Sequence, residues 1–331
     1  MEYVKKTKKK EHKPHRPPFI TMRRQQKTVG SLALVLHMGI LLSSHNVPLC
    51  RCEHVLNSVQ DQVIQALERH MQCDLHMRNN VSSRKNTTKW DGKGLPFLVN
   101  LGWPKSGTTT LTQFLDMVNK IKTRGHNKCH WQWPGVKPPK GFTSKYICDM
   151  FQFMTEQQKT FQYVKNLTHC HSITQLDCPP EDQVHESPWP QVTHLPMIAN
   201  WAKEDSSMRY LLLTRDFDGW YTSCNNWVGT YGSMTDRMYA SLPFLLNWKI
   251  RDDLQSNETF KRRYMQAYHD CHHIRVRKHF AHHDISHLLL EFHLEKHAPN
   301  ELIRFLGLDP AKFLTYWKPE NVNKKVHPYG L

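Results

Sequence analysis

Residues 95–121, LPFLVNLGWPKSGTTTLTQFLDMVNKI, decide the fold that this sequence predicts. The stretch begins with the apolar run FLV at residues 97–99, which is short and hydrophobic enough for a buried strand. A turn of small residues follows, and apolar side chains then recur every three or four positions from Leu111 to Ile121, as on one face of a helix. The pattern therefore predicts a strand, a tight turn and a helix.

The turn between this strand and this helix has the composition of an anion-binding site. The first backbone N–H groups of a helix have no partner within the helix, and the helix dipole places partial positive charge there. Lys105 adds a full positive charge, and the residues after it add hydroxyl groups. We expect these residues to bind phosphate or sulfate: Lys105, Ser106, Gly107, Thr108, Thr109 and Thr110.

The spacing of the turn distinguishes it from the loop of nucleotide-hydrolysing proteins. Those loops follow GxxxxGK[ST], in which the lysine comes directly after the last glycine. Here Lys105 comes two residues before Gly107. The order PKSGTT instead resembles the 5′-phosphosulfate loop of the sulfotransferases, which use 3′-phosphoadenosine 5′-phosphosulfate (PAPS) as the sulfuryl donor.

A second stretch resembles the same family. Residues 210–214, YLLLT, predict another buried strand, and Arg215 follows directly. Ser223 comes eight residues after this arginine. Sulfotransferases carry an arginine at the end of a central strand and a serine eight residues later, and both hold the 3′-phosphate of PAPS. Arginine suits this role because it is permanently charged and can bind phosphate through two parallel hydrogen bonds.

The resemblance implies a membrane-bound, Golgi-type sulfotransferase with the P-loop-like fold, an α/β fold whose parallel sheet is flanked by helices. It implies in-line sulfuryl transfer from PAPS to a hydroxyl or amine, with PAP as the product and no metal. A glycan is the favoured acceptor, ahead of a protein or a small alcohol. Lys105 and the nearby backbone amides would offset the charge that grows on the bridging oxygen. A P-loop nucleotide kinase and a non-catalytic lumenal protein that binds nucleotide or glycan remain alternatives.

Sulfuryl transfer needs a group that takes the proton of the acceptor, and histidine is well tuned to this near neutral pH. In sulfotransferases a His or Glu base often lies some way beyond the phosphosulfate loop, and the resemblance makes His130 the first candidate and His126 the second. Trp131, Trp133 and Trp189 are candidates for stacking on sugar rings.

The start of the chain predicts a membrane anchor. The formal net charge of the 331 residues is +16, and ten of the 45 Lys and Arg residues lie within the first thirty. The apolar segment 29–42 follows, and although it is shorter than the roughly 20 residues of a full span, it fits a signal anchor. We therefore expect a cytoplasmic basic tail at 1–28, an anchor at 29–42, a stem or linker at 43–90 and a lumenal sulfotransferase domain at 91–331. The chain would be a single-pass type II Golgi protein whose tail does not bind nucleic acid; a cleaved signal and a secreted protein are the alternative.

Cysteines and glycosylation signals suit a lumenal domain. The nine cysteines form no zinc-finger pairs, so disulfides in an oxidising compartment are expected, although their pairing cannot be deduced. The His- and Cys-containing segments 169–171 and 272–273 match no standard zinc spacing, so no metal site is predicted. Four Asn-x-Ser/Thr sequons occur, at Asn80, Asn86, Asn166 and Asn257.

Three further segments predict regular structure. Residues 55–67 carry apolar side chains at helical spacing within the expected linker. Residues 287–292 predict a strand, and residues 298–308 predict a helix that ends at a glycine.

Overall fold

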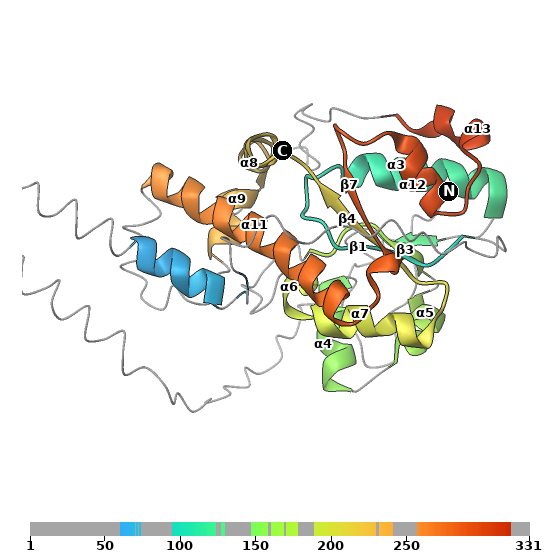
Figure 1. Ribbon diagram of the computed structural model, residues 1–331, viewed down its shortest axis with the longest axis horizontal. Helices are drawn as coiled ribbons and strands as arrows, with labels where there is room; N and C mark the ends of the chain where they lie inside the picture. Colours follow the sequence, from blue (N-terminus) through green and yellow to red (C-terminus); the bar gives the residue numbers. More distant parts are fainter. Residues whose placement is uncertain are drawn as a thin grey trace, which may run out of the picture. The chain divides into compact units, whose positions relative to one another are not determined.

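The structure is a computed structural model (Figure 1), and residues from Ser58 to Leu331 form one compact unit. The predicted tail and anchor lie outside the described residues. No helix in the described part of the chain is long and apolar enough to cross a membrane. The described residues are 60–69, 71, 73, 95–123, 127–129, 147–157, 160–168, 170–177, 189–229, 232–240 and 257–318.

A five-stranded sheet forms the centre of the compact unit, and every neighbouring pair of its strands is parallel. The strand order is β2-β3-β1-β4-β7. The predicted α/β class with a parallel, helix-flanked sheet is confirmed. Because all strands run in one direction, their carboxyl ends lie at a single edge of the sheet. The strands are β1 (Leu98–Asn100), β2 (Asn127–Cys129), β3 (Cys170–Ile173), β4 (Arg209–Thr214) and β7 (Leu289–His293).

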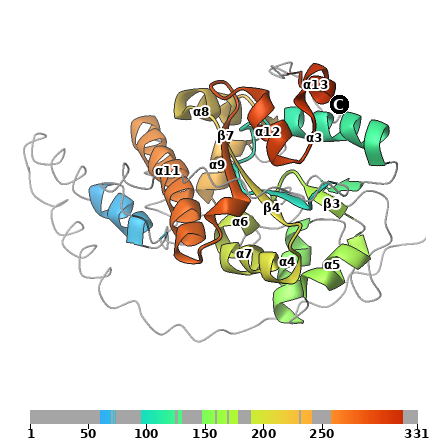
Figure 2. The ribbon, with the colours of Figure 1, turned by 45° about the vertical axis from the view of Figure 1, so that its right-hand side comes forward.

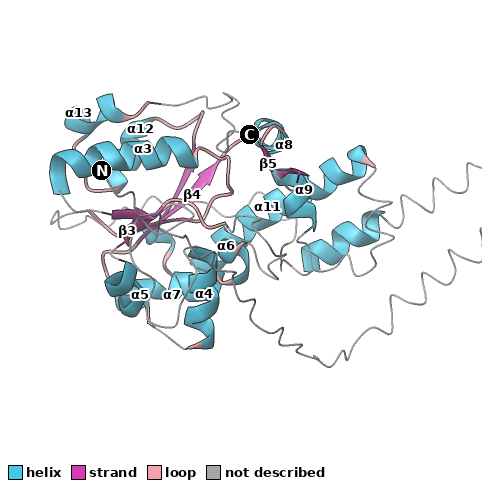
Figure 3. Cartoon of the chain, turned by 180° about the vertical axis from the view of Figure 1, so that it is seen from behind, coloured by secondary structure: helices cyan, strands magenta, loops and turns pink. Residues whose placement is uncertain are grey.

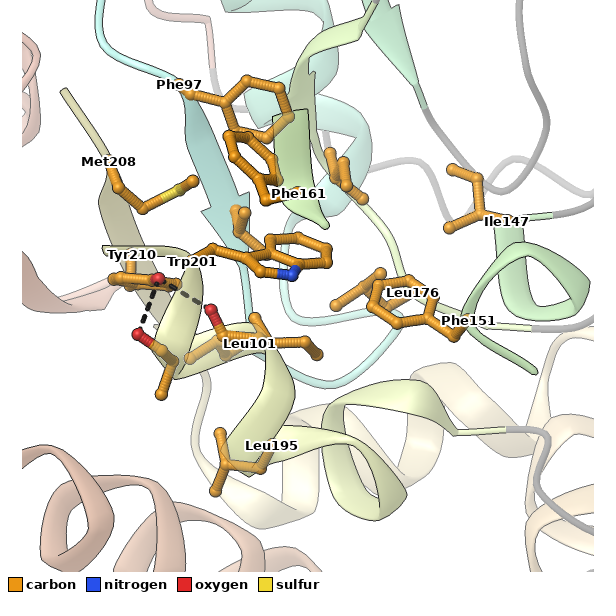
Figure 4. Packing of buried hydrophobic residues seen from close by; sticks show 14 of the residues in the cluster. Phe97, Leu101, Ile147, Phe151, Phe161, Leu176, Leu195, Trp201, Met208 and Tyr210 are labelled. Carbon is orange, nitrogen blue, oxygen red and sulfur yellow. Dashed lines mark hydrogen bonds between the residues drawn. The ribbon is translucent and has the colours of Figure 1, made fainter. Parts of the chain in front are cut away.

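The two faces of the sheet bury separate hydrophobic clusters. Along β4 all six residues are buried, and its side chains alternate between the clusters: Tyr210 and Leu212 lie in one, and Leu211 and Leu213 in the other. A strand that is covered on both faces is apolar throughout, which explains why the run YLLLT was recognisable in the sequence. The Tyr210 hydroxyl donates to backbone carbonyls of α7 (Leu195–Glu204), as Figure 4 shows.

Helices cover both faces of the sheet (Figures 1 and 3). On one face lie α3 (Thr108–Val118), α12 (Pro299–Phe305) and α13 (Pro310–Phe313), followed by the short 3₁₀ helix Leu314–Tyr316. On the other lie α4 (Ile147–Glu156), α5 (Phe161–Thr168) and α7.

The predicted elements shift slightly in the structure. The helix predicted to run to Ile121 ends as an α-helix at Val118 and continues as the π-helical segment Asn119–Thr123. The predicted strand 287–292 begins with a 3₁₀ turn, Ser286–Leu288, before β7.

A third hydrophobic cluster joins the remaining helices beside the sheet. It contains side chains of α8, α9 and α11, with residues of the helix 60–69 packed on them. Figure 2 shows this helix beside α11. The bounds are α6 (Pro190–Thr193), α8 (Phe217–Asn225), β5 (Val228–Gly229), β6 (Gly232–Ser233), α9 (Met234–Ala240) and α11 (Glu258–His282).

The helix 60–69 is part of the compact unit, although the sequence placed it in a linker. Leu67 is fully buried in the third cluster, and Arg263 of α11 pairs with Asp61 at 2.9 Å. A disulfide joins Cys73 to Cys271. The folded unit therefore includes part of the predicted stem, and it begins before the expected boundary at residue 91.

A second disulfide, between Cys129 and Cys170, joins the neighbouring strands β2 and β3. Cys224 of α8 is buried and carries a free thiol. Both disulfides have Cα separations within the usual range, at 5.4 Å and 5.7 Å.

Candidate functional site

The turn after β1 is held firmly where it leaves the sheet. The Leu101 carbonyl accepts a hydrogen bond from His272 Nε2 at 2.7 Å, and Trp103 is fully buried among the aromatic side chains of the third cluster. At Gly102 the chain passes so close to β4 that a Cβ atom would lie 2.1 Å from the Leu213 carbonyl oxygen. The loop therefore starts from a fixed position at the carboxyl edge of the sheet.

The backbone of the loop adopts an unusual conformation at two positions. Lys105 has φ of 67° and Gly107 has φ of 107°, and the residue between them does not share the positive φ. Non-glycine residues adopt this left-handed region uncommonly. An alternation of left- and right-handed residues turns successive N–H groups toward a common concave side and forms an anion-binding nest. Gly107 is the N-cap of α3, and no side chain caps that helix terminus.

Most of the loop hydroxyl groups point into the protein. Ser106 is fully buried, and within the described residues its Oγ has no hydrogen-bond partner. Thr108 is buried and donates its Oγ1 hydrogen to Gln175 Oε1 at 2.8 Å, and Thr110 is also buried. Thr109 is exposed. The Ser106 N–H is engaged, since it donates to the Trp103 carbonyl at 3.3 Å. The loop therefore offers an anion the N–H groups that follow Ser106, together with Lys105 and the Thr109 hydroxyl.

Lys105 lies among aromatic and charged groups. Its Nζ is 5.1 Å from the centre of the Trp227 ring, and the guanidinium of Arg237 from α9 is 5.2 Å from the same ring. Burial lowers the pKa of Lys105, against the attraction of the nearby Cys224 and Asp177. Burial also lowers the pKa of Arg237, which remains a permanent cation.

The second predicted string lies at the same edge of the sheet. Arg215 follows β4 directly, and its Nε donates to Glu295 Oε1 at 2.9 Å. Glu295 follows β7, the parallel neighbour of β4. Ser223 lies in the second turn of α8 and is half-buried. The Arg215 side chain is 17% exposed and that of Glu295 is 47% exposed, so an anion that approaches from solvent can compete for the arginine.

Asp216 is held by a lysine and a histidine. Lys296 and His293 Nε2 both contact its carboxylate, the histidine at 3.2 Å. These hydrogen bonds, with the Lys296 contact the largest cause, lower the pKa of Asp216.

The structure brings the two strings together. Trp220 of α8 donates its Nε1 hydrogen to the Pro104 carbonyl at 2.8 Å, so the helix after Arg215 is bonded to the loop that carries Lys105. The buried Cys224 thiol lies within electrostatic reach of both Lys105 and Arg215; burial raises its pKa. The two predicted phosphate-binding segments, about 110 residues apart in the sequence, are therefore bonded to each other at the carboxyl edge of the sheet.

Trp189 packs in the core, which is the more usual role of tryptophan, and is not available for stacking on a sugar. Its side chain is 3% exposed and packs edge-on against Trp103, at 5.9 Å between ring centres, so its ring face is covered by protein. The other predicted aromatic and proton-accepting residues lie outside the described part of the chain: His126, His130, Trp131 and Trp133.

Three residues of the site were missed by the sequence analysis: Asp177, Trp227 and Arg237. Asp177 follows β3, whose sequence CHSI is too short and too polar to be recognised as a buried strand. Trp227 and Arg237 flank the small hairpin of β5 and β6, and no motif marks them. Within the described residues, no group of three or more His, Cys, Asp or Glu side chains is placed to hold a metal ion.

Comparison of the chain with protein-family models, with curated proteins and with solved structures found no match to any of them.

Proposed function

We propose that this protein transfers a sulfuryl group from PAPS to a hydroxyl or amine acceptor. The observation that carries the proposal is the hydrogen bond between Trp220 and the Pro104 carbonyl, because it unites the PKSGTT loop and the Arg215 segment. PAPS carries anionic groups at the 3′ and 5′ positions of its ribose, and the two segments each supply a cation, Arg215 and Lys105. The parallel sheet supports the proposal at the level of its class, with both segments at the carboxyl edge.

The first segment would bind the 5′-phosphosulfate. The nest at Lys105 and Gly107, the start of α3 and the Lys105 ammonium group would surround its oxygens. Lys105 would stabilise the charge on the bridging oxygen as the sulfuryl group leaves.

The second segment would bind the 3′-phosphate. Arg215 would exchange its contact with Glu295 for two parallel bonds to phosphate, and Ser223 would add a hydroxyl from α8. The proton acceptor that follows from the resemblance is His130 or His126.

The proposal includes a place in the cell and a class of acceptor. We propose a type II Golgi protein with a lumenal catalytic domain, and the two disulfides favour such an oxidising compartment. A glycan remains the favoured acceptor. A nucleotide kinase would require magnesium, and a non-catalytic binder would retain PAP without turnover, so transfer in EDTA separates both alternatives from a sulfotransferase.

Calorimetric titration of the full chain with PAP, in buffer that contains EDTA, tests the nucleotide site. Arg215→Ala should weaken PAP binding by about 10- to 100-fold, since a hydrogen bond to a charged group contributes about 1.5–3 kcal/mol. Glu295→Gln should strengthen binding by a few-fold at most, because an exposed ion pair that competes with phosphate contributes less than about 1 kcal/mol.

Arg304→Ala serves as the matched control, because Arg304 is an exposed arginine of α12. Equal losses in the Arg215 and Arg304 variants would indicate a general charge effect. No PAP binding by correctly folded wild-type protein would refute the nucleotide site.

A further inference from the structure

A buried carboxyl group lies beside the phosphosulfate loop. Asp177 comes four residues after β3, and β3 is a parallel neighbour of β1. The carboxyl ends of these two strands lie side by side, which places Asp177 at the same sheet edge as Lys105. Only 5% of Asp177 is exposed. A carboxyl group rarely occupies such a position unless specific partners hold it.

Hydrogen bonds tie this carboxyl group to the start of α3. Gln175 Nε2 donates to Asp177 Oδ1 at 2.6 Å, and Gln175 Oε1 accepts the hydrogen of Thr108 Oγ1 at 2.8 Å. Both ends of the Gln175 amide are engaged, so this side chain orients the carboxyl group. Thr108 is the first residue of α3. Asp177 is therefore coupled to the helix terminus that we propose holds the 5′-phosphosulfate.

Two cations on different elements face Asp177. Lys105 of the loop and Arg237 of α9 both lie within electrostatic range of its carboxyl group, and both lie against the Trp227 ring. Burial raises the pKa of Asp177; the Gln175 hydrogen bond and the two cations oppose this effect without cancelling it. A carboxylate with a raised pKa, placed in a site, accepts protons more readily than an exposed carboxylate does.

We propose that Asp177 is a catalytic residue that accepts the proton of the acceptor hydroxyl group during sulfuryl transfer. This inference rests on the proposed sulfotransferase function. The acceptor oxygen forms a bond to sulfur while the bond from sulfur to the bridging oxygen of PAPS breaks. PAP leaves with that electron pair beside Lys105, and the acceptor proton passes to a carboxylate oxygen of Asp177. Gln175 holds the carboxylate in place throughout.

The assignment changes the expected role of the two histidines. If Asp177 takes the proton, His126 and His130 are dispensable for the chemical step. Their replacement by alanine should leave the pH dependence of kcat unchanged.

The test uses the full chain with radiolabelled PAPS and three acceptors: desulfated heparin, desulfated chondroitin and an acidic peptide that contains tyrosine. Asp177→Asn should lower kcat by about 10²- to 10⁴-fold, the usual contribution of a general base. PAP affinity and Tm should stay close to the wild-type values. Wild-type kcat should fall as the pH drops through the pKa of Asp177, because only the ionised carboxylate accepts a proton. The Asn variant should lack this acidic limb, and Asp177→Glu should recover part of the rate.

Three results would overturn the inference. If Asp177→Asn keeps the kcat of the wild type, or if its kcat still falls at low pH, the proton acceptor would again be His126 or His130. A parallel loss of kcat, PAP affinity and Tm would show that Asp177 only supports the loop. If Asp177→Asn does not fold, the inference is tested by measuring kcat, PAP affinity and Tm for Gln175→Ala. This variant keeps the carboxyl group of Asp177 and removes the side chain that orients it.

Failure of the proposed function gives a different pattern. Wild-type protein that binds PAP but transfers sulfate to none of the acceptors would refute the transferase. Wild-type protein that does not bind PAP would refute the nucleotide site itself.

Discussion

Lys105→Ala should abolish sulfuryl transfer, with kcat at least about 10²- to 10³-fold below wild type, which is the usual effect of removing one group that stabilises the departing charge. The loss should fall mainly on kcat, because negative charge grows on the bridging oxygen only as the sulfuryl group leaves. PAP affinity should change less, since the loop amides and Arg215 still hold both phosphates. The measurement is steady-state transfer from radiolabelled PAPS, together with calorimetric titration of PAP.

Two variants control for this result. Lys105→Arg keeps a cation and should retain part of the rate, although its planar guanidinium differs in shape from the ammonium group. Lys120→Ala removes an exposed lysine just after the same helix and should leave kcat unchanged. Near-normal kcat in Lys105→Ala would show that the loop does not contact the departing group.

The sequence was sufficient to predict the two central strands of the sheet and the two segments with cations that follow them. β1 and β4 are buried on both faces, so each is a continuous apolar run that ends at a polar turn. Arg215 could be placed because it directly follows β4, and Lys105 because it lies in the turn between β1 and the helix. Their proximity then follows from the parallel pairing of β1 with β4, which brings both turns to one edge.

The acceptor side of the site could not be predicted in the same way. Asp177 follows β3, a strand of only four residues that include polar side chains. The pairing of β3 with β1 joins residues that are far apart in the sequence, and no local motif marks it. Trp227 and Arg237 reach Lys105 only because α8 and α9 fold back across the loop, which depends on the packing of the third cluster. Such contacts depend on tertiary structure, and spacing within one sequence does not reveal them.

The sequence also does not show which acidic side chains of the protein itself pair with its cationic residues. Glu295 lies 80 residues from Arg215, and β7 brings them together because it pairs with β4. Glu295 pairs with the arginine that we propose binds the 3′-phosphate.

Gly102→Ala should destabilise the protein by about 4 kcal/mol or more, a large effect for one methyl group. The added Cβ would lie 2.1 Å from the Leu213 carbonyl oxygen and 2.9 Å from the Leu213 backbone nitrogen. Both atoms belong to the central strand β4, so no side-chain rotation can relieve the clash. The strand or the loop must move, which costs packing on both faces of the sheet.

Thermal unfolding followed by circular dichroism measures this effect, and the Tm should fall by roughly 10 °C. Gly219→Ala is the matched control. Its Cβ would lie 3.2 Å from Arg215 Nε, at the end of a flexible side chain, and Gly219 is inside α8. Alanine favours a helix over glycine by about 0.5–1 kcal/mol, so this variant should be as stable as wild type or slightly more so. Equal stability of the two variants would contradict the close approach of the loop to β4. A loss confined to Gly102→Ala would establish that the phosphosulfate loop is held against the central strand, which is the contact that fixes Lys105 at the carboxyl edge of the sheet.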